Sequence, residues 1–185
     1  LVLNQAPQEI FLDPSITHRL DFADYPGNSR KLSGFSVTGV RSRSDLGEIN
    51  RIYNSLKMVP VDEDYVWRNR ESDKFRYFVA RADESGEILG VVLGVDHMAN
   101  FNDLINGSSL WALAVDKQAQ LPGIGEALVR KVIEYHRDRG RERLDLSVLH
   151  DNENAIHLYR KLGFHKVAVF AVKCRNPINE RLFVP

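Results

Sequence analysis

The sequence predicts an α/β (α+β) fold, in which helices flank a mixed and mostly antiparallel central sheet. The first observation behind this prediction is a pair of β-rich runs, 75–81 and 88–95, which the turn-forming sequence Asp-Glu-Ser-Gly joins as a hairpin. The second is the order strand, helix, strand between residues 110 and 148, because a crossover of this kind connects two parallel strands. A chain of 185 residues without internal repeats has the length of one ordinary domain.

The elements before the hairpin follow from local signals. Residues 1–34 mix Pro and Gly with isolated apolar residues and show no period of 2 or 3.6, so we expect an irregular lead-in. Alternation over 35–40 predicts the first strand. An Asp followed by a Glu three residues later, before an apolar stripe, predicts a helix over 45–58 that Pro60 ends. A shorter helix is expected over 62–70.

The elements after the hairpin alternate between strands and helices. They are, in order, a strand over 110–115, a helix over 124–140, a strand over 144–148, a helix over 152–162, a strand over 167–173 and a polar tail over 175–185 that resembles an outgoing linker. Both helices carry apolar residues at helical spacing and end near a glycine, which is a common helix stop. The last strand is expected to close the sheet.

The composition excludes several classes of function. Lys and Arg number 25, as do Asp and Glu, so the chain lacks the basic excess that nucleic-acid or anionic-membrane binding requires. The longest apolar run, 88–95, is far shorter than the ~20 residues of a membrane span. Cys174 is the single cysteine, which excludes an internal disulfide and favours a reducing compartment, the cytoplasm. The histidines form no ligand-like group, so no metal is expected. A chain that begins at Leu1 is expected after removal of a tag or excision from a longer polypeptide.

The most informative stretch joins the strand over 110–115 to the helix that follows it. The stretch reads Val115-Asp-Lys-Gln-Ala-Gln-Leu-Pro-Gly-Ile-Gly125. Glycines in this place let a ligand approach the backbone closely, and the N–H groups at a helix start, together with the helix dipole, form a site for phosphate. A tight turn without a ligand is the alternative, because short glycine patterns are common by chance.

A second motif follows one strand later, and it reads Asn154-Ala-Ile-His-Leu-Tyr159-Arg-Lys-Leu-Gly-Phe164. In this order and spacing, the two motifs resemble the GNAT N-acetyltransferase superfamily over about 35–172. The loop resembles the acyl-CoA motif Q/R-x-x-G-x-G/A, and the second stretch resembles the last motif of the family. The resemblance implies the GNAT fold, with splayed parallel strands 4 and 5, and an acetyltransferase domain over 35–174.

The resemblance also implies which residues form the site. Tyr159 would be the catalytic general acid that protonates the departing CoA thiolate. A backbone N–H near Val115 would stabilise the developing oxyanion, so neither a covalent intermediate nor a nucleophilic Cys174 is needed. The loop would hold the pyrophosphate of acetyl-CoA, and the strand edge and Asn154 would meet its pantetheine arm. The implied cofactor-binding residues are Leu113, Ala114, Val115, Gln120, Leu121, Pro122, Gly123, Ile124, Gly125 and Asn154.

The chain departs from the family pattern at two places. Leu121 and Pro122 stand where many relatives have Gly and Arg, and Pro122 removes one donor from the loop. The strand over 110–114 lacks the Glu that often relays a proton from the amine. The candidate bases elsewhere are Asp96, His97 and His150. For each of them, a solvated loop residue or a core histidine with satisfied hydrogen bonds is the favoured interpretation. An α-amine with a pKa near ~8 is partly neutral at pH 7, so water could suffice, and the missing Glu favours an α-amino acceptor.

The sequence therefore predicts an enzyme, an N-acetyltransferase that moves an acetyl group from acetyl-CoA directly to the primary amine of a small molecule. The runs 144–152 and 173–180 also resemble the acetyltransferase part of bacterial fusion enzymes that carry an ATP-grasp ligase and make N-acetylglutaminylglutamine amide-type osmolytes. That resemblance implies a linked ATP-grasp domain as a partner, and glutamine or a glutamine dipeptide as the acceptor. The alternatives are an acyl-CoA-binding module without turnover and a protein or peptide N-acetyltransferase.

Overall fold

The computed structural model describes residues 10–12, 15–27, 32–168 and 172–174. The chain divides into two compact units, and each is described by itself. The larger unit comprises Leu20–Asp145, and the smaller combines Leu1–Arg19 with Leu146–Pro185. The tail predicted over 175–185 lies outside the described residues.

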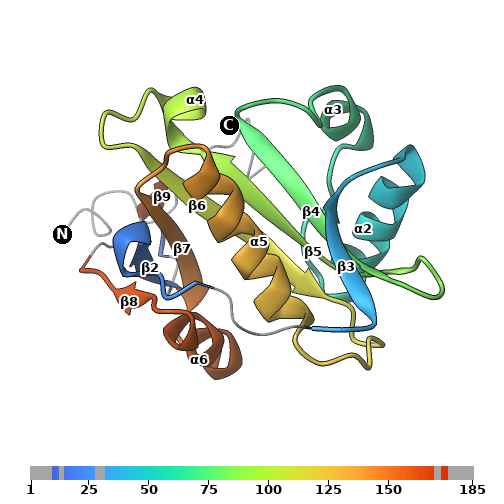
Figure 1. Cartoon of the computed structure of the whole chain (residues 1–185). Coiled ribbons are helices and arrows are strands. Elements are labelled where there is room, and N and C mark those ends of the chain that lie inside the picture. Colours follow the sequence, from blue (N-terminus) through green and yellow to red (C-terminus); the bar gives the residue numbers. More distant parts are fainter. Residues whose placement is uncertain (1–9, 13–14, 28–31, 169–171, 175–185) are drawn as a thin grey trace. The chain divides into compact units, whose positions relative to one another are not determined.

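A sheet forms the centre of the larger unit (Figure 1). Its strands are β3 (Phe35–Gly39), β4 (Phe75–Ala82), β5 (Ile88–Asp96), β6 (Gly107–Val115) and the beginning of β7 (Arg143–Leu149). β3, β4, β5 and β6 pair antiparallel in this order. β6 and β7 are parallel from Gly107↔Arg143 to Ser109↔Asp145. The predicted hairpin and the parallel crossover are therefore confirmed, whereas the splay further along would involve both units and stays a prediction.

Helices cover both faces of this sheet. The helical elements of the larger unit are η1 (Phe22–Asp24), α2 (Arg43–Ser55), α3 (Glu63–Arg68), α4 (His97–Phe101) and α5 (Ile124–Asp138). Gly90 of β5 faces α5, because a Cβ added there would lie 3.0 Å from Ile124 and 3.1 Å from Leu128. The next residue, Val91, packs in a core cluster with Leu46 of α2. Successive side chains of a strand point to opposite faces, so α5 and α2 lie on opposite sides of the sheet.

The smaller unit contains one helix and short strands. These elements are β1 (Ile10–Leu12), β2 (Ser15–Asp21, whose last two residues belong to the larger unit), α6 (Glu153–Lys161), β8 (His165–Lys166) and β9 (Val172–Cys174). β2 pairs antiparallel with β8, and β1 pairs antiparallel with β9 in a separate two-stranded sheet. The hydrogen-bonded order of the main sheet is β3-β4-β5-β6-β7-β2-β8, which confirms a mixed, mostly antiparallel α/β fold.

The prediction of an irregular lead-in over 1–34 is wrong for residues 10–12 and 15–24, because β1 and β2 are strands and η1 is a short helix. β2 does alternate: His18 and Leu20 are buried, and their neighbours are less so. The signal was hidden because a histidine occupies an inward position where the pattern requires an apolar residue. Burial lowers the pKa of His18 below its ordinary 6.5, so the buried ring stays neutral.

Three further boundaries differ from the sequence prediction. α2 begins earlier, because Ser42 is its N-cap and forms a capping box with Asp45, whose backbone N–H donates to the Ser42 hydroxyl. The single strand expected over 167–173 is wrong, because β8 and β9 lie in two different sheets. α4 was not predicted, since five residues are too few to show a helical period.

None of the helices in the described part of the chain combines the length and the apolar character that crossing a bilayer requires. The same residues hold no group of three or more His, Cys, Asp or Glu side chains that could bind a metal ion.

Candidate active site

The loop after β6 takes its path from one buried carboxylate. Asp116 is 6% exposed, and its N–H donates to the Leu89 carbonyl at 2.9 Å. Its carboxylate accepts from the Gln118 N–H at 2.9 Å and from the Arg51 guanidinium of α2 at 2.6 Å. These two donors hold the pKa of Asp116 below its ordinary value, so the carboxylate is ionised at neutral pH. The turn that leads to α5 is therefore held by hydrogen bonds of Asp116 with Leu89 of β5 and with Arg51 of α2.

Replacing Arg51 by glutamine is expected to loosen this turn. Arg51 is partly exposed, so the loss should be about 1 kcal/mol of loop stability, seen as about fivefold weaker CoA binding in calorimetry. Arg43→Gln is the matched control, because it removes an exposed ion pair of α2 with Asp64. Equal CoA affinities of the two variants would contradict a role for Arg51 in shaping the loop.

The loop enters α5 through a left-handed glycine. Gly123 has a φ of 85° and is the N-cap of the helix, a conformation that costs other residues about 1–2 kcal/mol. A Cβ there would lie 2.8 Å from a methyl carbon of Leu32, so the position is also closely packed. The N–H groups of the first turn of a helix have no acceptor within the helix, and the dipole adds partial positive charge. This arrangement suits a phosphate group.

The structure brings the six predicted loop residues together at this helix start. Gln120, Leu121 and Pro122 are exposed, and Gly123 and Gly125 are half-buried. The side chain of Ile124 is buried in the core, which leaves only its backbone for a ligand.

β6, which leads into the loop, contains an irregularity that the sequence did not predict. Leu93 of β5 faces Trp111 and Val91 faces Ala114, so one residue of β5 stands opposite two residues of β6. Ala112, one of the two, has a φ of 49°, and its carbonyl accepts from the buried Tyr53 hydroxyl at 3.0 Å. The bulge interrupts the pleat where the predicted pantetheine-binding residues 113–115 begin.

The second motif forms α6 in the smaller unit. Asn152 caps the helix by accepting from the Ala155 N–H at 3.2 Å. Tyr159 is 5% exposed and packs against Phe164, with ring centres 5.7 Å apart. Burial raises the pKa of Tyr159 to about 12, and its hydroxyl has no hydrogen-bond partner among the described residues. Asn154 is exposed. It lies five residues before Tyr159 on the same helix, so the two side chains point in different directions.

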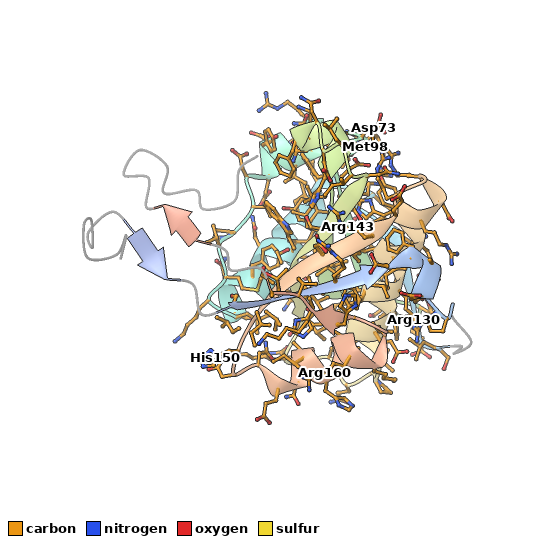
Figure 2. The ribbon with its side chains drawn as sticks, turned by 90° about the vertical axis from the view of Figure 1, so that its left-hand side faces the viewer. Asp73, Met98, Arg130, Arg143, His150 and Arg160 are labelled. Carbon is orange, nitrogen blue, oxygen red and sulfur yellow. The ribbon has the colours of Figure 1, made fainter. Side chains whose placement is uncertain are left out.

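The three candidate bases have different surroundings. Asp96 is 1% exposed, caps α4 through the Ala99 N–H and accepts from Arg141 at 2.7 Å. Burial alone would raise the pKa of Asp96, but these two donors hold it below 3.8. His150 is exposed in the smaller unit, and it is labelled in Figure 2. His97 is half-buried in the larger unit and contacts Ser109 of β6.

Asp96 therefore has a structural role, and Asp96→Asn is expected to lower the free energy of unfolding by about 3 kcal/mol, because Arg141 loses its buried partner. The lowered pKa of Asp96 means that its contribution is complete above about pH 4 and is lost as the pH falls through that pKa. Denaturant unfolding at pH 7 and at acidic pH measures both effects. A variant as stable as the wild type at pH 7 would contradict this role.

Sequence reasoning missed Arg51, Tyr53 and Ser109. Arg51 and Tyr53 lie on the predicted apolar helix over 45–58, far along the chain from Asp116 and Ala112, which they contact. A left-handed alanine at position 112 carries no sequence signal at all.

Several known proteins are similar to this chain in sequence. Residues 46–164 match the sequence profile described as the Acetyltransferase (GNAT) family. A mycothiol acetyltransferase of Saccharomonospora viridis is 37% identical over 102 residues, which cover 53% of this chain and 33% of that protein. The L-amino acid N-acetyltransferase AaaT of Escherichia coli is 29% identical over 123 residues, covering 61% of this chain and 68% of that protein. An N-alpha-acetyltransferase of Sulfurisphaera tokodaii is 31% identical over 99 residues, which cover 50% of this chain and 58% of that protein.

Solved structures share the fold at low sequence identity. A GNAT N-acetyltransferase of Sphaerobacter thermophilus superposes with a TM-score of 0.65 at 18% identity, over 95% of this chain and 56% of that one. A tandem GNAT protein from the clavulanic acid biosynthesis pathway gives a TM-score of 0.66 at 14% identity, over 95% of this chain and 57% of that one. The chain thus spans only part of several relatives that it matches. The resemblance to the ATP-grasp fusion enzymes is not confirmed by these comparisons.

Proposed function

The chain belongs to the GNAT acetyltransferase family, and from this premise we propose that it transfers an acetyl group from acetyl-CoA to the α-amine of a small amino acid or dipeptide, with glutamine among the candidates. The transfer is direct, from the thioester to the amine. The observation that carries the proposal is the start of α5, where Gly123 adopts a left-handed conformation after a turn that Asp116 fixes.

This helix start supports a CoA donor. Gly123 and Gly125 are half-buried, and the backbone N–H groups at this start of the fifteen-residue helix α5 carry the positive end of its dipole. A Cβ at position 123 would lie 2.8 Å from a methyl carbon of Leu32, so glycine suits this closely packed turn. The pyrophosphate of acetyl-CoA fits this group of donors, and Leu113, Ala114 and Val115 would pair with the pantetheine arm. Gln120, Leu121, Pro122 and Ile124 would contribute backbone contacts, with one donor fewer because of the proline.

α6 supports the chemical step. A proton donor must carry its proton at neutral pH, and a pKa of about 12 keeps the phenol of Tyr159 protonated. Tyr159 would donate to the sulfur as the thiolate leaves, and Asn154 would contact the pantetheine or acyl region. A backbone N–H near Val115 would stabilise the oxyanion.

Two observations favour an α-amine as the acceptor. The names of two relatives specify an L-amino acid and an N-alpha position. The described part of β6 has no carboxylate at 110–115, and an α-amine with a pKa near ~8 needs less help than a lysine side chain at ~10.4.

An acceptor screen at saturating acetyl-CoA tests this proposal. Glutamine, its amide and glutamine dipeptides are expected to outperform lysine side chains and polyamines, and the rate is expected to rise with pH through the α-amine pKa near ~8. The measurement is release of free CoA. Acetylation of spermidine or of a lysine peptide, with none of the glutamine compounds, would overturn the acceptor assignment and favour the protein acetyltransferase alternative.

A further inference from the structure

Two side chains of α2 hold β6 and the residue that follows it at the two ends of one short segment. The Tyr53 hydroxyl donates to the Ala112 carbonyl at 3.0 Å, and the Arg51 guanidinium donates to the Asp116 carboxylate at 2.6 Å. Between these two anchors lie residues 113–115, which are expected to pair with the pantetheine arm. α2 and β6 belong to the larger unit and are labelled in Figure 1. The helix therefore controls the course of the strand where the donor is expected.

Ala112 has an unusual backbone for a strand residue. Its φ is 49°, in the left-handed region that side chains disfavour. The other three non-glycine residues of the described chain with a positive φ lie outside helices and strands; they are Lys57, Asn102 and Asn106. Ala112 is also exposed, whereas the first four residues of β6, 107–110, are buried. A strained conformation persists only where its surroundings impose it, and such strain concentrates at functional sites. This outlier therefore points to a functional role for the middle of β6.

Tyr53 supplies the hydrogen bond that holds this conformation. Its side chain is 1% exposed and packs in a core cluster with Ile49 and Ile52. Burial raises the pKa of Tyr53 well above its ordinary 10, so the hydroxyl keeps its proton and stays a donor at neutral pH. A strand carbonyl ordinarily points to a neighbouring strand, but the carbonyl of Ala112 is turned towards α2.

The segment 113–115 presents a backbone N–H to the edge of β6 that does not face β5. The Asp116 N–H donates to the Leu89 carbonyl of β5 at 2.9 Å. The N–H groups of successive residues in an extended strand alternate between its two edges, so the N–H of Val115 points to the edge opposite β5. The proposed reaction requires a backbone N–H near Val115 for the developing oxyanion, and this one is directed away from the ladder with β5.

We propose that Tyr53 is a positioning residue of the transfer reaction, an inference that rests on the proposed function. By holding the Ala112 carbonyl, its hydroxyl keeps β6 in the bulged path and so directs the N–H near Val115 at the thioester oxygen. The segment between Ala112 and Asp116 is short, so a strand released at Ala112 changes the direction of the N–H groups that follow. Tyr53 acts through the backbone, since its side chain is buried.

Tyr53→Phe separates this role from CoA binding. Phenylalanine keeps the ring in the core and removes the hydroxyl, so kcat is expected to fall about tenfold or more, because a misdirected N–H stabilises the oxyanion poorly. The Kd for CoA, measured by calorimetry, is expected to keep its wild-type value, because Arg51 still holds the loop. Tyr25→Phe is the matched control. Tyr25 is 8% exposed and its hydroxyl accepts from Arg130 at 2.9 Å, so this variant also loses a buried hydroxyl bond but should keep the wild-type kcat.

A second substitution tests whether Tyr53 acts through Ala112. Glycine adopts a left-handed backbone without strain, so adding Ala112→Gly to Tyr53→Phe is expected to restore most of the lost kcat. Wild-type kcat in the folded Tyr53→Phe variant would overturn the proposal. A loss of kcat that Ala112→Gly does not recover, or an equal loss in Tyr25→Phe, would overturn it as well.

Carbon-13 NMR of Ala112 tests the arrangement without turnover. The Cα and Cβ chemical shifts report the backbone conformation, and a bulge held by Tyr53 requires left-handed values in the wild type and a move towards extended values in Tyr53→Phe. Extended values in the wild type, or left-handed values that persist in Tyr53→Phe, would overturn the role of Tyr53. An enzyme that releases no CoA with any amine would refute the proposed function instead, and the shifts would still decide whether Tyr53 holds Ala112.

Discussion

Tyr159→Phe is expected to lower kcat by about 100-fold or more and to leave the affinity for CoA unchanged. The ring of Tyr159 is buried against Phe164, and phenylalanine keeps that contact. Only the hydroxyl is lost, and this hydroxyl has no hydrogen-bond partner among the described residues that its removal would leave unsatisfied. The stability of the variant should therefore stay close to that of the wild type, which separates a chemical role from a structural one.

Tyr135→Phe is the matched control for this substitution. Tyr135 lies on α5 and packs edge-on against Phe78, with ring centres 5.2 Å apart. Its variant should turn over at the wild-type rate. If Tyr159→Phe also turns over at the wild-type rate, Tyr159 is a packing residue and another group protonates the thiolate.

Replacing Gly123 and Gly125 together by alanine is expected to weaken CoA binding by at least tenfold, or about 1.4 kcal/mol. At position 123 the new Cβ would be forced against Leu32, and the left-handed backbone would be strained. Both effects move the N–H groups that the phosphates need. Isothermal calorimetry with CoA, on protein shown to be folded by circular dichroism, measures the change.

Gly86→Ala controls for the strain alone. Gly86 lies in the β4–β5 hairpin with a φ of 74°, and a Cβ there meets nothing within 4 Å. The control should lose about 1 kcal/mol of stability and no CoA affinity. Unchanged CoA affinity in the folded double variant would remove the loop from the donor site.

Local signals were enough to predict most of the fold. The hairpin, the strand–helix–strand crossover and the last two helices each depend on residues close together in the chain, so their patterns can be read directly. β2 was missed because His18 occupies an inward position, and α4 because it is too short to show a period. β8 and β9 look like one strand in the sequence, but their partners lie near the N-terminus.

In the candidate site too, the parts that are continuous in sequence could be predicted, and the contacts that only the fold creates could not. The loop over 120–125 is continuous in sequence, so its glycine spacing and its place before a helix were visible. The contact between His97 and Ser109 was not visible, because it forms only through the pairing of β5 with β6. His97 was one of three candidate bases, and only its contacts distinguish it from Asp96 and His150. The roles of Tyr159 and Asn154 stay predictions.

The most direct test of the central claim is a single incubation of the chain with acetyl-CoA and glutamine. Free CoA is followed with a thiol reagent, and the products are identified by mass spectrometry. The account predicts one N-α-acetylglutamine for each CoA released, with no acetylated protein accumulating. Binding of acetyl-CoA without CoA release, for glutamine and for every amine of the acceptor screen, would contradict it and identify the chain as an acyl-CoA-binding module.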